Sequence, residues 1–382
     1  MNTHVFVVDS NTFKVHLEYM FAGTGAGEKR SPFLMDSNIS FNWHTEQNLV
    51  AMIADISRIR PGDNIIFYLQ AFSNHPGMFF GVFKADSFGF FDENDENNYL
   101  VNNLRKGLSF RIRISPVEVF PKGVSEHEYL DNLEGKDRPC QLCWSLIYRK
   151  LKGNRGCTML TSYEYEDLLE KLKKKNNNIT LSGRRFSFDS QIGEIINIDH
   201  FFSLYEGRTQ SLDIEQRMIY KYNRGNAFET HLQAFVMQNF DKNRLKDFLL
   251  TLDNGNVWVG NEVSCGVGMQ RIDALFIEEN KSTICVKVIE LKDEEPYDYI
   301  LDEQLSWYLK WISQFMIPNL LKNGKIVKVY PCILAKQTND ERIINRIRES
   351  LFVIDEQNVI VEPTEYIGFN IIEDEISFIR IV

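Results

Sequence analysis

Hydrophobic positions in the second half of the chain predict a regular order of elements. Between 226 and 240 they recur at helical spacing, whereas later runs are short and continuous, as in buried strands. The helical stripe consists of Phe228, Leu232, Phe235 and Val236. The order is helix (226–240), strands (256–263, 270–278, 283–291), helix (297–315) and strand (325–334), with two short strands near 358–362 and 375–381.

The first half has a mixed pattern. Thr45 can cap a helix that runs through Ile59 with one apolar face. The segments 64–72 and 78–85 read as strands on either side of a turn, and 109–119 alternates apolar residues with arginines. Short strands around one or two helices predict a small α+β barrel.

A polar, Asn-rich and basic stretch at 171–185 separates the two patterns. Such stretches join domains more often than they fill cores. We therefore expect an N-terminal domain at 1–175, a connecting segment at 176–210 and a C-terminal domain at 211–382. Two domains also agree with a length of 382 residues.

The net charge of −10 is unevenly distributed. The first 175 residues hold 21 Lys and Arg against 22 Asp and Glu, and the remainder holds 22 against 31. Bulk charge therefore does not indicate a nucleic-acid partner, which would need local basic patches. Two such patches exist, at 149–155 and 171–185, and a solvated surface or charged linker explains either of them equally well.

Cysteine usage and hydropathy favour a cytoplasmic protein. Six cysteines do not form a disulfide framework, no apolar run approaches the ~20 residues of a membrane span, and the N-terminal segment does not resemble a secretory signal. Cys140 and Cys143 are spaced like zinc ligands, but zinc normally takes four ligands and only Cys157 and His127 lie nearby. A zinc site and buried free thiols both remain open.

Polar residues of the second half are placed so that they can converge. Glu290 and Lys292 are two positions apart on one predicted strand and therefore point to the same face. Asp273 lies on the strand before. The flanking helices add further polar side chains, namely Glu229, Gln304 and Tyr308.

This set suggests a metal-dependent reaction. Two adjacent carboxylates repel each other unless a cation lies between them, and hard oxygen ligands favour Mg²⁺ or Mn²⁺. Asp273, Glu290 and the carbonyl oxygen of Leu291 are the expected metal ligands. Lys292 beside them would stabilise charge that develops on a phosphate.

The segment 226–335 resembles the PD-(D/E)XK nuclease superfamily, and its RecB-like branch in particular. The resemblance rests on Glu229 in AFETHLQAF, Asp273 in QRIDALF, Glu290 and Lys292 in VIELKD, and Gln304 with Tyr308 in EQLSWYL. It implies a restriction-endonuclease-like α/β core of αβββαβ order. It also implies that Lys292 is the catalytic lysine, Glu229 an accessory acid, and Gln304 a residue that positions metal or substrate. Ile272 stands where the superfamily often has proline.

The resemblance to this nuclease core does not identify the substrate. The run VIELK also resembles the archaeal mismatch-type endonucleases and Holliday-junction resolvases, which share it.

Residues 1–170 resemble the PUA-like fold, in the YTH and EVE group of modified-base readers. The likeness rests on HVFVVDS, the run WHTEQN from Trp43, the strand pair IRPGDNIIFYL and GMFFGVFKA, and KGLSFRIRISPVEVF. Readers of this kind resemble the N-terminal domains of some modification-dependent restriction proteins.

A reader of this kind would hold a flipped base between aromatic rings and read its edge with polar groups. Trp43 is the expected first wall, and the second is expected from the loop after 81–85, as Phe90, Phe91 or Tyr99. Asn42 and Asn38 are candidates for reading the base edge. Phosphate contacts are expected from Arg149, Lys150, Lys152 and Arg155.

The sequence therefore predicts a Mg²⁺-dependent DNA endonuclease that recognises a modified base in double-stranded DNA, with methylation as the expected modification, and restricts foreign DNA. One active site cuts one strand, so a double-strand break would need a homodimer or transient pairing of two chains. Two alternatives remain: a conventional sequence- or structure-specific nuclease, and a non-catalytic RNA-binding protein.

Overall fold

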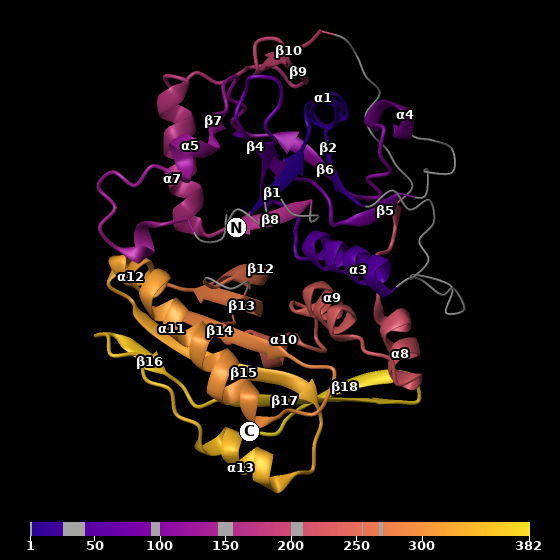
Figure 1. The fold of residues 1–382 in the computed structure, drawn as a ribbon, viewed down its shortest axis with the longest axis vertical. Helices are drawn as coiled ribbons and strands as arrows, with labels where there is room; N and C mark the ends of the chain where they lie inside the picture. The colour runs from indigo at the N-terminus through magenta and orange to yellow at the C-terminus, as the bar shows by residue number, and fades with distance from the viewer. Residues whose placement is uncertain are drawn as a thin grey trace. The chain divides into compact units, whose positions relative to one another are not determined.

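The chain folds into two compact units in the computed structural model (Figure 1). Unit 1 comprises Met1–Gly135 and Ser145–Leu212, and unit 2 comprises Lys136–Trp144 and Asp213–Val382. The structure describes residues 2–25, 43–92, 100–143, 156–199, 209–253, 255–266 and 270–382.

Unit 1 is built on a mixed nine-stranded sheet of order β11-β5-β6-β4-β3-β1-β8, with β2 on β6 and β7 on β4. β1 and β3 are parallel, and the other pairs are antiparallel. β6 pairs with β2 and β5 near its start and with β4 near its end, as a strand does where a sheet curls. The strands are β1 (Thr3–Val8), β2 (Phe21–Thr24), β3 (Asn64–Leu69), β4 (Met78–Ala85), β5 (Phe90–Asp92), β6 (Phe110–Pro116), β7 (Val124–Ser125), β8 (Cys157–Leu160) and β11 (Thr209–Gln210).

Phenylalanine rings fill the core of unit 1. Phe13 lies 5.3 Å from Phe67, 5.2 Å from Phe80 and 5.1 Å from Phe188, measured between ring centroids. Every residue of β3 is buried, as expected for a strand covered on both faces. The helices are α1 (Ser10–Tyr19), α3 (Trp43–Ser57), α4 (Val101–Leu104), α5 (Glu126–Tyr129) and α7 (Ser162–Lys175).

The expected connecting segment, 176–210, contains secondary structure of unit 1. β9 (Phe186–Asp189) and β10 (Glu194–Asn197) form a hairpin, and the Phe188 ring enters the phenylalanine core. Two aromatic residues in alternation, Phe186 and Phe188, anchor this hairpin despite the polar sequence before it. The domain division in the structure accordingly falls at Leu212 and Asp213.

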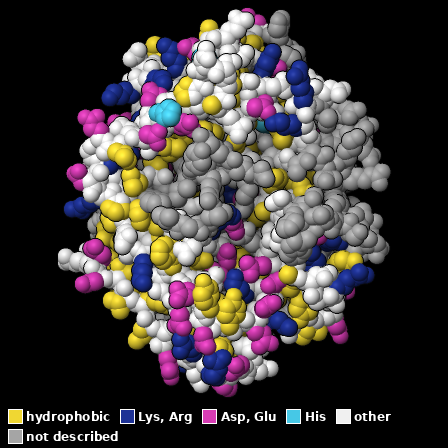
Figure 2. Space-filling view, in the orientation of Figure 1, with side chains coloured by type: hydrophobic (Ala, Val, Ile, Leu, Met, Phe, Trp, Pro, Cys, Tyr) yellow, Lys and Arg dark blue, Asp and Glu magenta, His cyan; other side chains and the backbone are white. Residues whose placement is uncertain are grey.

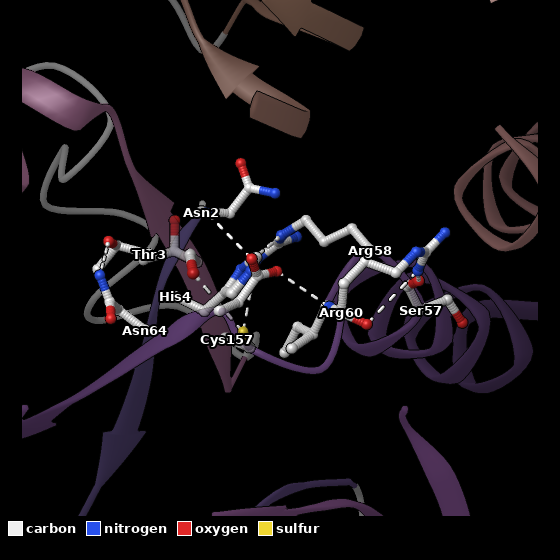
Figure 3. Close-up of polar contacts among 11 residues, drawn as sticks. Asn2, Thr3, His4, Ser57, Arg58, Arg60, Asn64 and Cys157 are labelled. Atoms are coloured by element: carbon white, nitrogen blue, oxygen red, sulfur yellow. Dashed lines mark hydrogen bonds and ion pairs between the residues drawn. The ribbon is translucent and has the colours of Figure 1, made fainter. Parts of the chain in front are cut away.

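A buried polar network joins β1, α3 and β8 (Figure 3). Asp63 Oδ2 lies 3.0 Å from His4 Nε2, and the other ring nitrogen, Nδ1, lies 3.4 Å from Arg58 Nε. Arg58 also donates to Asp55 Oδ1 at 2.8 Å and to the sulfur of Cys157 at 3.4 Å. Burial lowers the pKa of His4, against the opposing hydrogen bond and charge of Asp63. Such a hydrogen-bonded network fixes strand and helix positions inside an apolar core.

Unit 2 has a seven-stranded sheet of order β12-β13-β14-β15-β17-β18, with β16 on β15. β12, β13 and β14 form an antiparallel meander, and β15 is parallel to β14. The strands are β12 (Asn256–Ser264), β13 (Arg271–Glu279), β14 (Thr283–Leu291), β15 (Ile326–Lys336), β16 (Val359–Val361), β17 (Glu365–Ile372) and β18 (Glu375–Arg380).

The predicted order of helix, three strands, helix and strand is observed as α9, β12, β13, β14, α11 and β15. The second helix differs from expectation because its first part, η3, is π-helical. The helical elements are η2 (Pro139–Gln141), α8 (Glu215–Asn223), α9 (Glu229–Asn239), α10 (Lys246–Leu249), η3 (Ile300–Leu305), α11 (Ser306–Phe315), α12 (Ile317–Leu320), η4 (Leu321–Asn323) and α13 (Glu341–Glu349).

Ion pairs link α13 to η3. Arg346 lies 2.9 Å from Asp298 and 2.7 Å from Asp302, and Arg342 lies 3.0 Å from Asp298. Figure 2 shows basic and acidic side chains intermixed over the region where Figure 1 places α13. Pairs as exposed as these stabilise a fold only weakly, but several together orient the segment that leads into η3.

Within the described residues, no helix is long and apolar enough to cross a membrane.

Candidate active site

Asp273 and Glu290 come together on neighbouring strands. The β13–β14 register pairs Ala274 with Ile289, so the next step places Asp273 opposite Glu290 on the same face. Asp273 Oδ2 accepts a 2.8 Å hydrogen bond from the backbone nitrogen of Leu291, which fixes the carboxylate against β14. Glu290 is only 1% exposed, so its charge needs partners inside the fold.

Lys292 supplies one of these partners. Its Nζ lies 2.8 Å from Glu290 Oε1 and 3.1 Å from Glu229 Oε2. Lys292 follows β14 by one residue, and its backbone nitrogen continues the ladder by donating to Leu334 O at 3.0 Å. The two-residue spacing from Glu290 therefore places both side chains on one face, as expected.

Glu229 reaches the site from the first turn of α9. Asp293, next to Lys292, accepts hydrogen bonds at its Oδ2 from the backbone nitrogens of Phe228 at 2.5 Å and Glu229 at 3.1 Å. The carboxylate of Asp293 therefore satisfies donors that the start of a helix leaves open. The end of β14 in this way holds α9, and with it Glu229, in place.

Gln304 and Tyr308 hold Glu290 from the other side. Gln304 Nε2 donates to Oε1 at 2.5 Å, and the Tyr308 hydroxyl donates to Oε2 at 2.8 Å. Gln304 lies in the π-helical turn η3, a distortion frequent at functional sites. Its amide oxygen is buried and has no hydrogen-bond partner among the described residues.

These side chains surround a cavity of about 340 Å³. The full lining comprises Glu229, Glu262, Gln270, Arg271, Asp273, Glu290, Lys292, Tyr299, Glu303, Gln304, Trp307 and Tyr308. Asp273, Glu290, Lys292, Glu229 and Gln304, expected as a group from the sequence, thus share one cavity. Five carboxylates against two cations give this lining an excess of negative charge.

Sequence reasoning missed Glu262 and Arg271. Glu262 lies within β12 at a positive φ of 53°, and its carboxylate forms an ion pair with Arg271 and accepts a 3.3 Å hydrogen bond from Gln233. A non-glycine residue in this backbone region is uncommon and often marks a functional site. No spacing rule links these positions, so only the fold brings them together.

The electrostatics of the site follow from burial and crowding. Burial, and then the charge of Glu290, raise the pKa of Asp273 well above its ordinary value. Burial also raises the pKa of Glu229, against the opposing effect of Lys292. The neighbouring carboxylates outweigh burial at Lys292 and raise its pKa, so its ammonium stays charged.

The donor set fits a hard divalent cation. Asp273 and Glu290 offer oxygen ligands, the lining is acidic, and Gln304 has a buried oxygen without a partner in the described chain. Among the described residues, no cluster of three or more His, Cys, Asp and Glu side chains could hold a metal ion. Mg²⁺ agrees with a two-carboxylate set because it commonly keeps several waters and takes only one or two carboxylates.

The expected base pocket is less well supported. Phe90 and Phe91 are 4% and 2% exposed, and the Phe90 ring packs in a cluster with Val15, Phe21 and Leu104. Both rings are buried in the described structure, and their expected role as cage walls stays a prediction. All three residues of β5 are buried.

The other residues expected in the base pocket and at the phosphates lie outside the described residues, or have side chains that do. Trp43 begins α3, but its side chain is outside the described residues. Asn38, Asn42 and Tyr99 also lie outside them, as do all four expected phosphate contacts, Arg149, Lys150, Lys152 and Arg155.

Cys140 and Cys143 are not joined in a disulfide. Cys140 lies in η2, where its side chain is buried and its carbonyl oxygen accepts a hydrogen bond from Asn319 Nδ2 at 2.5 Å. The contact ties this short segment to α12 within unit 2.

No protein-family model matches the chain, and no curated protein matches it. Several solved structures are similar to part of it, and three of them are described here. They are a hypothetical protein from Leishmania major (11% identity, TM-score 0.30, 46% of this chain and 96% of that one), human THYN1 in complex with 5-methylcytosine-containing DNA (9%, 0.26, 45% and 98%), and protein Atu2648 from Agrobacterium tumefaciens (13%, 0.26, 48% and 100%). At these TM-scores the likenesses carry no argument about this chain's activity.

Proposed function

We propose that unit 2 is a Mg²⁺- or Mn²⁺-dependent endonuclease that hydrolyses phosphodiester bonds of DNA. The observation that carries the proposal is the meeting of Asp273, Glu290 and Lys292 at one cavity, with Glu229 and Gln304 beside them. Two carboxylates with a charged lysine suit a reaction in which negative charge grows on a phosphate.

Within this proposal, Asp273 and Glu290 would hold the ion, and Lys292 would donate a hydrogen bond to a phosphate oxygen. A bound ion supplies electrophilic stabilisation of the phosphate and lowers the pKa of water. Glu229 and Glu290 orient the Lys292 ammonium, while Gln304 and Tyr308 fix the Glu290 carboxylate through both of its oxygens. The lysine acts as a cation because its pKa is raised.

The finer part of the proposal assigns unit 1 to reading a modified base in double-stranded DNA, with restriction of foreign DNA as the biological role. Support for it comes from the sequence resemblance to modified-base readers. Cutting both strands requires two active sites and hence a homodimer on the substrate.

Incubation of the full chain with Mg²⁺ and matched plasmids tests both parts. The plasmids are unmodified or carry methyladenine, methylcytosine or hydroxymethylcytosine. Asp273→Ala and Lys292→Ala should each lower the cleavage rate by about 10²–10³-fold or more. The control is Lys281→Ala, which removes an exposed lysine from the turn of the same hairpin and should cut like wild type.

Cleavage that survives in EDTA, or in both site variants, would contradict the metal-dependent centre. Equal cleavage of all plasmids would instead favour a conventional nuclease over a modification-dependent one.

A further inference from the structure

Exposed aromatic side chains gather beside the cavity of unit 2. Among the described residues of the whole chain, the large hydrophobic side chains that are exposed include four aromatic ones, Phe88, Tyr297, Tyr299 and Trp307. Three of these four lie within one eleven-residue stretch of unit 2. An aromatic side chain buries a large apolar area when it packs, so a group left in solvent points to a binding surface.

Two of the three aromatic residues face the proposed site. Tyr299, 56% exposed, and Trp307, 39% exposed, line the same cavity as Asp273, Glu290 and Lys292. Tyr297 is 44% exposed and is not part of the lining. Polar groups that suit a phosphate and flat apolar groups that suit a ring system therefore share one opening.

Trp307 is held in a fixed orientation. Its indole nitrogen donates a 2.7 Å hydrogen bond to the carbonyl oxygen of Cys265. Gly266, at a φ of +124°, packs against the indole so closely that a Cβ there would lie 3.1 Å from Trp307 Cζ2. A ring already ordered in the free protein loses little conformational entropy when a ligand stacks on it.

The geometry points to Tyr299 and Trp307 as a base-stacking platform. We propose that they stack on an unpaired nucleobase next to the phosphodiester bond held at the cavity, so that this centre acts on DNA with unstacked nucleotides at the point of cutting. The inference rests on the proposed nuclease function and specifies its substrate.

The reason for an unpaired base is steric. In a duplex each base is already covered by its neighbours above and below, so an aromatic ring reaches its face only when the nucleotide leaves the stack. Aromatic stacking on single-stranded DNA tolerates any base, because every base offers such a face. The platform would therefore distinguish unpaired from paired DNA, and any recognition of base sequence would come from other parts of the chain.

Photo-crosslinking of the full-length protein tests the contact directly. The probes are two otherwise identical oligonucleotide duplexes with 5-iododeoxyuridine either inside a four-nucleotide unpaired bubble or in a base pair. Irradiation in EDTA, which prevents metal-dependent cutting, should crosslink the bubble probe to Trp307 or Tyr299, as mapped by peptide mass spectrometry. Crosslinks confined to other residues would overturn the proposal.

Affinities of variants for the same probes give the second measurement. Trp307→Ala should bind the bubble about 5- to 150-fold more weakly, equivalent to about 1–3 kcal/mol at 1.4 kcal/mol per tenfold, with little change for the paired duplex. Tyr297→Ala is the matched control and should bind like wild type. Trp307→Phe keeps a ring and should recover most of the affinity, which separates stacking from a folding defect.

The two proposals fail in different ways. If wild type cuts DNA but Trp307→Ala binds the bubble probe as tightly as wild type does, the stacking proposal is wrong and the nuclease proposal stands. If Trp307→Ala selectively loses bubble binding but the wild-type protein never cuts DNA, the stacking contact stands and the nuclease proposal is wrong.

Discussion

Asp273 illustrates how a single residue can cost stability for the sake of a site. Its carboxylate faces Glu290 across two paired strands and is held by one backbone donor, the Leu291 nitrogen. Burial and the Glu290 charge raise its pKa, so the folded state resists its ionisation. Lys292 offsets part of this cost, because its charge favours the ionised carboxylate.

A prediction follows for Asp273→Asn, whose amide oxygen can still accept the bond from Leu291. Because the folded-state pKa is raised above the ordinary 3.8, wild-type protein in EDTA loses stability as the pH rises from about 4 towards the folded-state value. The asparagine variant should escape this loss. Its advantage in unfolding free energy should therefore grow from pH 4 to pH 7, as measured by urea denaturation.

With Mg²⁺ present, wild type should become the more stable of the two proteins. Wild type should gain stability with added Mg²⁺, by about 1.4 kcal/mol at ten times Kd, whereas Asp273→Asn should gain much less. Asp355→Asn, at an exposed position, is the control and should follow wild type throughout. A variant less stable than wild type at pH 7 in EDTA would refute the electrostatic argument.

At the scale of elements, helix α9 and the end of β14 are coupled through one carboxylate. Asp293 accepts from the first backbone donors of α9, and α9 carries Glu229 to Lys292. The π-helical turn plays the matching role on the other side, where it directs Gln304 at Glu290. The site is thus assembled from three elements that each need the others for their position.

Asp293→Ala should lower the unfolding free energy by about 0.5–2 kcal/mol, the usual effect of losing a helix cap, and should also slow cleavage because Glu229 is no longer held. The matched control is Asp340→Ala, which removes the cap of α13, where Asp340 accepts from the Arg342 nitrogen at 2.9 Å. It should lose comparable stability yet cut at the wild-type rate. Equal cleavage by both variants would show that the cap does not position Glu229.

At the scale of the whole molecule, the chain does not divide into two uninterrupted halves. Residues 136–144 belong to unit 2 although unit 1 continues from 145 to 212. Cys140 is buried there, and its carbonyl oxygen accepts from Asn319, itself 8% exposed. A cut after Leu212 therefore removes part of the packing of unit 2.

A fragment spanning 213–382 should accordingly melt below the unit 2 transition of the intact chain, because Asn319 loses an acceptor and an apolar contact surface opens. Adding a peptide of residues 136–144 should raise its melting temperature, and a scrambled peptide should not. A fragment that melts like the intact chain, by calorimetry, would contradict this division.

The sequence alone was enough for the order α9, β12, β13, β14, α11 and β15 in unit 2 and for six residues of its cavity, but it did not predict α13 or β17. Helical and strand periodicities are local, and the two-residue spacing of Glu290 and Lys292 fixes their shared face whatever else surrounds them. The same local rules did not predict the hairpin within 176–210, where two phenylalanines outweigh a polar composition. Nor did they predict the burial of Phe90 and Phe91, which depends on distant partners.

Only the tertiary structure decided the rest. Glu262 and Arg271 reach the cavity through strand pairing, 136–144 joins unit 2 across an intervening stretch, and Trp307 is fixed by a carbonyl more than forty positions earlier. The physical reason is the same in each case: these contacts depend on strand pairing and packing between different elements, which local periodicity does not reveal.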